Sequence, residues 1–465
     1  MSAKDFSDHM SDADALMWNI EKDPILRSTI VAVGILETAP DWKRLQKRFE
    51  VATRTIPRLR QRVLSPPLRI GPPRWAVESD FDLNYHLRRI HLPPGATHRE
   101  LLDFVAPIAQ ASFDRARPPW EATVIEGLED GRAALVMKVH HSVTDGVGGV
   151  ELLAQLVDLT ADATLPTNAP AAPAAEQLGG TDLVRESIAH TTRRIMGIGS
   201  RIPSVAIETA TSAARDPFGS TVRAVDTARS IGRAVAPASA PMSPLMTARG
   251  MGRRLDTLEF TLDEMKRAAK AGQGSLNDAF VASVIGGLMR YHDRHDSPVD
   301  ELRMTMPINI RTEGADAAGN HFAPARFGVP TNIDDPIERM RAVGALVKEW
   351  RQEPALGLTG TLAGVLNRLP TSTTTALFGG MLKCVDFVTS NVPGAPVPVY
   401  LGGAKVQHFF AFGPPSGAAV NVTLMSHIDK CCIGIVTDTA AVPDVTQLVA
   451  DIEAGFAEIV ALGAE

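Results

Sequence analysis

Two adjacent histidines, His140 and His141, are followed by Asp145 and Gly146. Histidine titrates near neutral pH and is the usual general base of enzymes, and a carboxylate nearby can orient its ring or hold the turn through a buried ion pair. A lone histidine at the end of a strand is more often a structural residue with satisfied hydrogen bonds. The pattern indicates a site for proton transfer, and the elements around it decide which ring can act.

The segment 133–141 contains only apolar or β-compatible residues, with no Gly or Pro, and is predicted to be a strand. Because successive side chains of a strand point to opposite faces, His141 should share one face with Val139, and His140 should lie on the other with Lys138. The two rings should therefore not share a ligand or a metal. After Gly146 the apolar residues recur at helical spacing, so the histidine pair closes a strand beside a tight turn into a helix.

The complete pattern His-His-x-x-x-Asp-Gly resembles the signature of the chloramphenicol acetyltransferase-like superfamily. This superfamily includes peptide condensation domains and the bacterial wax ester synthase/diacylglycerol acyltransferase family. The resemblance implies that His141 is the catalytic base. We expect His140 and Asp145 to support the architecture of the site, with Asp145 paired to an arginine such as Arg311 or Arg60.

Further segments are similar to those of the wax ester synthase family, in matching order along nearly the whole chain. Pro118-Pro119-Trp120 stands where members commonly carry Pro-Leu-Trp, and an Asn-Asp pair recurs at Asn277-Asp278. The resemblance makes Gly146, Trp120, Asn277 and Asp278 candidate substrate-binding residues. Two alternatives stay open: Trp120 can be a core aromatic, and Ser275 with Asp278 has the spacing of a helix capping box.

Composition narrows the class of protein. The net charge is −6, from 47 basic and 53 acidic residues, which argues against a general nucleic-acid binder. The three cysteines form no Cys-x-x-Cys pair, so neither a disulfide framework nor a metal site is expected. The adjacent Cys431 and Cys432 should alternate across a strand, one in the core and one at the surface.

The N-terminus is polar, and no apolar run approaches the ~18 residues of a membrane helix. We expect a cytoplasmic protein, at most peripheral to the inner membrane or to lipid droplets.

The organisation predicted along the chain is two lobes joined by a linker. We expect an N-terminal lobe at 1–160, an Ala/Pro/Arg-rich helical crossover at 161–250 and a C-terminal lobe at 251–465. The crossover includes 181–250, where nine arginines and five acids give +4, so it is a candidate for an anionic membrane surface; a solvated linker is the alternative. The fold class implied by the resemblance is α/β (α+β), with a mixed sheet and helices in each lobe and an active-site tunnel between them.

No Gly-x-Ser-x-Gly nucleophile elbow occurs in the sequence, so direct transfer is the economical mechanism. The resemblance implies a long-chain acyl-CoA co-substrate, no cofactor, and diacylglycerol or a fatty alcohol as the acceptor. Two alternatives are a condensation-type or polyketide-linked acyltransferase of the same superfamily and a non-catalytic lipid-binding relative.

Overall fold

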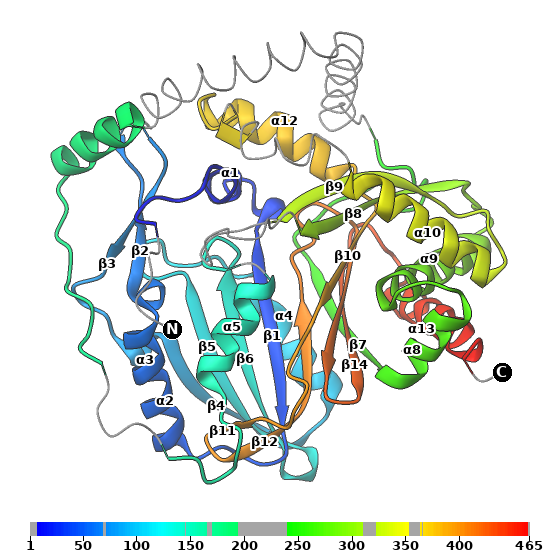
Figure 1. Cartoon of the computed structure of the whole chain (residues 1–465), viewed down its shortest axis with the longest axis horizontal. Helices are drawn as coiled ribbons and strands as arrows, with labels where there is room; N and C mark the ends of the chain where they lie inside the picture. The colour runs from blue at the N-terminus through cyan, green and yellow to red at the C-terminus, as the bar shows by residue number, and fades with distance from the viewer. Residues whose placement is uncertain are drawn as a thin grey trace, which may run out of the picture.

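The computed structural model describes residues 7–67, 71–144, 146–164, 170–193, 240–309, 322–352, 363–364 and 366–463. Helices and strands are interspersed along the described residues, and two six-stranded mixed sheets organise them (Figure 1). This confirms the predicted α/β class with a sheet and helices in each lobe.

The first sheet has the strand order β11-β12-β1-β6-β5-β4. Only β4 and β5 run parallel; the other neighbours are antiparallel. Its strands are β1 (Thr29–Leu36), β4 (Leu87–Ala96), β5 (Trp120–Leu128), β6 (Ala133–His140), β11 (Tyr400–Leu401) and β12 (Ala404–Phe412). A separate two-stranded ribbon pairs β2 (Gln61–Leu64) with β3 (Arg74–Val77).

Each face of this sheet is covered. Apolar side chains of α2 (Trp42–Thr55) and α5 (Gly146–Leu156) pack on one face, in a cluster with Leu135, Met137 and Val139 of β6. The other face packs against α4 (His98–Gln110) and against two strands of the second sheet. The remaining N-terminal elements are α1 (Asp12–Ile20), α3 (Leu83–His86) and the 3₁₀ turns η1 (Pro24–Leu26), η2 (Pro57–Arg60) and η4 (Glu129–Gly131).

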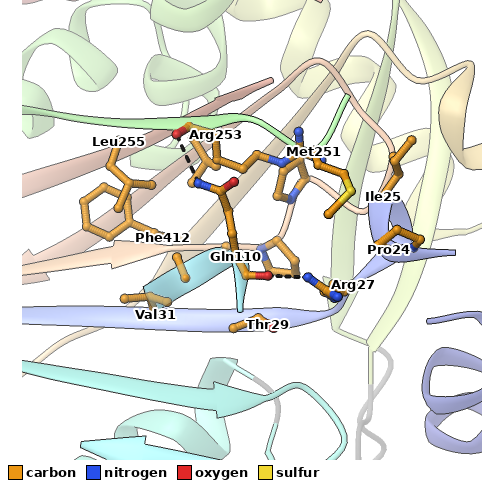
Figure 2. A pocket seen from close by; sticks show the side chains of 15 residues that line it. Pro24, Ile25, Arg27, Thr29, Val31, Gln110, Met251, Arg253, Leu255 and Phe412 are labelled. Carbon is orange, nitrogen blue, oxygen red and sulfur yellow. Dashed lines mark hydrogen bonds between the residues drawn. The ribbon is translucent and has the colours of Figure 1, made fainter. Parts of the chain in front are cut away.

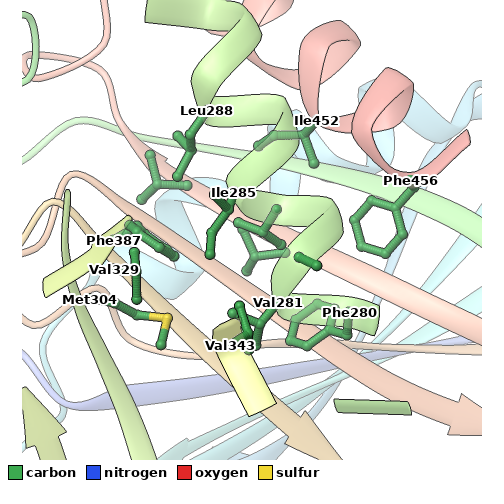
Figure 3. Close-up of a cluster of buried hydrophobic side chains, with 14 of the residues drawn as sticks. Phe280, Val281, Ile285, Leu288, Met304, Val329, Val343, Phe387, Ile452 and Phe456 are labelled. Atoms are coloured by element: carbon green, nitrogen blue, oxygen red, sulfur yellow. The ribbon is translucent and has the colours of Figure 1, made fainter. Parts of the chain in front are cut away.

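The second sheet has the order β7-β14-β13-β10-β8-β9. Its strands are β7 (Arg253–Thr261), β8 (Glu301–Asn309), β9 (Phe322–Pro330), β10 (Phe387–Val392), β13 (Val420–His427) and β14 (Lys430–Asp438). The helices of this lobe are α8 (Leu262–Ala271), α9 (Leu276–Arg294), α10 (Pro336–Arg351), α12 (Thr371–Lys383) and α13 (Val445–Ala461). Helix α9 is buried between the sheet and α13, where Phe280, Ile285 and Phe456 meet Met304 and Phe387 (Figure 3).

The prediction that one of the adjacent cysteines lies at the surface is wrong. Cys431 and Cys432 do alternate across β14, but both are fully buried. Cys431 belongs to the helix-covered core of the C-terminal lobe, whereas Cys432 packs with Val31 and Val33 of the N-terminal sheet. The second face of the C-terminal sheet is buried because the other lobe covers it.

The predicted lobe boundaries need two corrections. Strands β11 and β12 come from the C-terminal third of the chain but extend the N-terminal sheet, with β12 antiparallel to β1. The crossover also ends earlier than residue 250, since Met246 is buried in the C-terminal core and the backbone of Met242 and Ser243 donates to Asp386. The pairing of β12 depends on partners distant in sequence, which local patterns do not identify. The composition of the crossover likewise does not show where its packing against the C-terminal core begins.

The described start of the crossover packs against the N-terminal lobe. Residues 180–193 are helical, and Leu183 and Ser187 are buried there. Arg74 of β3 forms ion pairs with Glu176 and Glu186, at 2.7 Å and 2.9 Å. Residues 194–235 of the crossover lie outside the described part of the chain, so the predicted helical character of that stretch stays a prediction.

Candidate active site

The histidine pair marks the end of β6 and the start of the turn into α5. The strand ends at His140, one residue before the predicted end, and Gly146 is the first residue of the helix. The backbone N–H of His141 donates to the carbonyl of Ser28, over 2.8 Å, just before β1 begins. His141 is partly exposed, whereas His140 is completely buried.

Both nitrogens of the His140 ring are engaged. Nδ1 accepts the backbone N–H of Ser142 at 3.0 Å and lies 2.7 Å from the Ser142 hydroxyl oxygen. Nε2 lies 3.0 Å from Oε1 of Glu21. Because a backbone N–H can only donate, Nδ1 must be the acceptor and Nε2 must carry the proton. His140 is therefore held as the neutral Nε2–H tautomer, and its geometry offers no lone pair to a substrate.

Glu21 is a site residue that the sequence analysis missed. It is the C-cap residue of α1, and its Oε1 accepts the backbone N–H of Ser28 at 2.7 Å as well as the His140 ring N–H. Burial acts to raise the pKa of Glu21, but its hydrogen bonds from His140 and the Ser28 N–H, with the charge of Arg115, outweigh burial and bring the net pKa below its usual value. A lone acid after a short helix gives no sequence signal for a partner 119 residues away.

Lys138 shares the buried face with His140, as the strand alternation predicted. Its side chain is 1% exposed, with Nζ 3.7 Å from Oε1 of Glu121 and 4.3 Å from the centre of the Phe113 ring. Burial lowers the pKa of Lys138. The opposite face carries Val139 and is wholly apolar at β6, so the predicted placement of Lys138 and His140 opposite Val139 is confirmed. That His141 shares the face of Val139 stays a prediction, because the strand ends at His140.

The contacts of Trp120 favour the core alternative over a substrate contact. The side chain is 1% exposed, and its indole N–H donates to the carbonyl of Leu59 at 2.8 Å. Its ring stacks on His86 and Phe49, with centroids 4.6 Å and 6.1 Å apart. Nothing in these contacts leaves a face of the indole open to an acyl chain.

The Asn277-Asp278 pair opens α9, and the capping-box alternative accounts for its aspartate. Oδ2 of Asp278 accepts the Ser275 backbone N–H at 2.8 Å, while the Ser275 hydroxyl oxygen accepts the Asp278 N–H at 3.3 Å. Asn277 is partly buried, and its amide lies 3.8 Å from the sulfur of Met306. The aspartate therefore has a structural role, and the asparagine keeps its side chain near the end of β8.

The predicted pairing of Asp145 falls outside the described residues, as does Arg311. Arg60, the other proposed partner, donates to Oε1 of Glu50 at 2.9 Å and to the Thr53 hydroxyl at 3.2 Å. Those contacts tie η2 to α2.

A small pocket with about 50 Å³ of accessible space, partly open to solvent, lies where the two lobes meet. Figure 2 shows Gln110 of α4 at its centre, next to Arg27 and Arg253, with Phe412 and Leu255 on one side. Thr29 lines the pocket and is the cross-strand partner of His140, which places the pocket on the His140 face of the sheet. His141 is not among its lining residues, so the predicted tunnel with His141 at its middle is not traced by this pocket.

Among the described residues, no group of three or more His, Cys, Asp or Glu side chains is placed to hold a metal ion. No described helix is both long and apolar enough to cross a bilayer.

Comparison with known proteins matches two family models to the chain. Residues 10–280 match the wax ester synthase/diacylglycerol acyltransferase catalytic domain, and residues 318–460 match the C-terminal domain of the same family. A Mycobacterium tuberculosis protein named "Putative diacyglycerol O-acyltransferase" is 39% identical over 456 residues, covering 98% of this chain and 92% of the relative. A second M. tuberculosis protein of that name is 30% identical and covers 97% of each chain.

Solved structures share the fold at low identity. The wax ester synthase/diacylglycerol acyltransferase from Marinobacter aquaeolei VT8 superposes with a TM-score of 0.65 at 23% identity, over 98% of this chain and all of the other. The first condensation domain of the calcium-dependent antibiotic synthetase gives a TM-score of 0.62 at 16% identity, over 98% and 96% of the two chains. The two-lobe fold, the histidine motif and the two matched domains lead to one conclusion: this chain belongs to the wax ester synthase/diacylglycerol acyltransferase family of acyltransferases.

Proposed function

We propose that the protein transfers a long-chain acyl group from acyl-CoA to the hydroxyl of diacylglycerol, with fatty alcohols as a second class of acceptor, and that His141 is the general base. The observation that carries the choice of base is the unequal state of the two histidines. His140 is sealed from solvent with both ring nitrogens engaged, whereas His141 stands past the strand end and is partly exposed. Membership of the family supports the acyl transfer, and the names of the mycobacterial relatives support the acceptor.

In the proposed reaction, His141 removes the proton of the acceptor hydroxyl as its oxygen attacks the thioester carbonyl. The tetrahedral intermediate then expels the CoA thiolate, which takes the proton from His141, so one ester and one free thiol leave the enzyme. General-base action of this kind contributes about 10²–10⁴-fold, and holding both substrates together contributes at least as much. No acyl-enzyme is required.

The test is acyl transfer from labelled palmitoyl-CoA to dioleoylglycerol or to hexadecanol by the purified protein and its His141→Ala variant. We expect the variant to lose ~10²-fold or more of kcat while its melting temperature stays close to wild type. His140→Ala should lower both kcat and the melting temperature, since it leaves Glu21 and Ser142 without their partner at a cost of about 1–3 kcal/mol of stability. His91→Ala, at a ring 63% exposed on β4, is the matched control.

A His141→Ala variant with full activity would show that another group is the base. Label trapped on the protein after acid quenching would contradict direct transfer. Activity with carrier-bound but not CoA-bound acyl groups would instead favour a condensation-type reaction.

We also propose peripheral attachment to an anionic membrane or lipid-droplet surface through the basic crossover. Its sequence carries more arginines than acids, and Ile188 of the helix 180–193 is 50% exposed. Basic amphipathic segments bind anionic interfaces through charge and apolar insertion together. Flotation with phosphatidylglycerol vesicles should fall when residues 201–235 are replaced by a Gly/Ser linker; unchanged flotation would remove the idea.

A further inference from the structure

Glu21 occupies a position between the N-terminal helix and the histidine pair. Its side chain is 12% exposed, and one oxygen, Oε1, accepts two hydrogen bonds. One comes from the backbone N–H of Ser28 at 2.7 Å and the other from the ring N–H of His140 at 3.0 Å. Hydrogen bonds to a carboxylate are strong, so two donors on one oxygen of a nearly buried side chain hold that carboxylate in one orientation.

The two partners of Glu21 both lead to His141. Ser28 receives the His141 backbone N–H on its carbonyl, at 2.8 Å, while its own N–H is held by Glu21. His140 precedes His141 directly, and its ring is fixed between Glu21 and Ser142. The backbone of His141 is therefore restrained from both strands by contacts that converge on one carboxylate.

The structure holds Glu21 itself in place. Helix α1, whose C-cap is Glu21, packs against α12 of the C-terminal lobe, and Leu16, Ile20 and Leu26 share a buried cluster with Ala363. Asn367 donates to the carbonyl of Asp12 at 2.7 Å. The aromatic ring of Trp18 stands edge-on to His140, with centroids 4.8 Å apart.

We propose that Glu21 is a positioning residue for the acyl transfer: together with the Ser142 N–H it holds the His140 ring as the Nε2–H tautomer, and through Ser28 and His140 it fixes the place of the His141 ring. This inference rests on the proposed function, because it takes His141 as the base. Glu21 does not touch the reacting atoms in this scheme. It acts through Ser28 and His140, and neither Glu21 nor Ser28 belongs to the family segments identified in the sequence.

The test compares Glu21→Ala and Glu21→Gln with wild type. Glutamine keeps an oxygen at the same place that can accept both N–H groups, whereas alanine removes it. We expect Glu21→Ala to lower kcat by about 10–100-fold, the range seen when the partner that orients a functional histidine is removed, with KM for palmitoyl-CoA changed less than about twofold. Glu21→Gln should recover much of kcat. Glu50→Gln, at a carboxylate that contacts Arg54 and Arg60 but neither histidine, is the control and should leave kcat unchanged.

A second readout is independent of turnover. In protein labelled with ¹⁵N-histidine, the His140 ring, identified by its loss in His140→Ala, should show a protonated Nε2 and an unprotonated Nδ1. Glu21→Ala removes the acceptor on the Nε2 side, so the ring can rotate away from the Ser142 N–H and the signal should become a mixture of tautomers; Glu21→Gln should preserve it. A merely structural cap would lower the melting temperature without moving either the tautomer or kcat.

Unchanged kcat and an unchanged His140 tautomer in Glu21→Ala would overturn the inference while leaving the acyl transfer intact. Wild-type protein without acyl transfer would instead contradict the proposed function, and the tautomer measurement would then still decide whether Glu21 holds His140. If Glu21→Ala does not fold, Glu21→Gln decides: a mixed tautomer in that variant, with the kcat of wild type, would contradict the positioning role.

Discussion

At the scale of single residues, the site depends on which nitrogen of each histidine is available. Strand alternation predicts that the two rings lie on opposite faces, but alternation alone does not say which one is sealed. That follows from Glu21 and Ser142, which occupy both nitrogens of His140. The unequal burial of two neighbours is what makes His141 the candidate base.

A third histidine, His86, makes a testable contribution to stability. It is fully buried, stacks on Trp120 and donates from Nδ1 to the Trp120 carbonyl at 2.7 Å. Burial lowers the pKa of His86 from 6.5 to about 4. The unfolded chain therefore takes up this proton near pH 6.5 and the folded protein only near 4, so the contribution is complete above pH 6.5 and is lost as the pH falls toward about 4.

We expect the urea unfolding free energy of wild type to decrease between about pH 6.5 and 5 by up to about 1.4 kcal/mol per pH unit from this group. His86→Phe keeps the stacked ring and should be less stable at neutral pH but with a shallower slope in that window. Because His9, whose pKa is also lowered to about 4, is the same in both proteins, the difference in slope isolates His86. Equal slopes would contradict the assignment.

At the scale of elements, the start of α9 shows how a recurring sequence segment can serve a helix rather than a substrate. Ser275 and Asp278 satisfy each other's backbone N–H groups, which are among the four that a helix N-terminus leaves unpaired. The helix they start carries much of the C-terminal core, including Phe280, Ile285 and Leu288 (Figure 3).

Ser275→Ala should therefore lower the unfolding free energy by about 0.5–2 kcal/mol, and Asp278→Ala by a similar amount. Because the two bonds form one box, the double variant should cost less than the two single variants added together. Asn277→Ala should cost little, since its one described polar contact is to a thioether sulfur. Chemical denaturation gives these values, and a raised KM in Asn277→Ala at unchanged stability would assign the asparagine to substrate binding after all.

At the scale of the whole molecule, the lobes are not independent in the chain. Strand β12 lies between β11 and β1 in the N-terminal sheet. The next strand in sequence, β13, belongs to the second sheet. Arg99 of α4 also forms an ion pair with Asp256 of β7, at 2.8 Å, and His98 contacts Thr257 at 2.8 Å. Figure 1 shows the two sheets side by side, with α12 over α1 above their junction.

Phe412, at the end of β12, belongs to the cluster that joins the two lobes and is 2% exposed. Phe412→Ala should cost about 3–5 kcal/mol, and both lobes should lose stability together. Trp350 lies in α10 and reports on the C-terminal lobe. In thermal unfolding, calorimetry and the fluorescence of a variant that retains only this tryptophan should give one coincident transition, and Phe412→Ala should lower its midpoint. Two separate transitions, with only one of them shifted, would show that the lobes unfold independently.

Local rules determined much of this molecule from the sequence. The strand before His140 and the Ser275 capping box follow from periodicity and capping, whose partners lie within four residues. The histidine motif and the family segments predicted the two-lobe fold and the acyltransferase class. They could do so because residues that perform the same reaction on the same fold keep the same spacing in the sequence.

Features that depend on contacts between residues distant in sequence were decided only by the tertiary structure. It brought Glu21 to His140 across 119 residues, placed β12 in the N-terminal sheet and buried Cys432 under the other lobe. Trp120 was left open by the sequence because an aromatic beside a motif has the same pattern whether it contacts a ligand or the core, and its stacking on His86 depends on how strands and helices meet. Propensity and spacing act over a few residues, whereas burial and the pairing of charges depend on the neighbours that folding supplies.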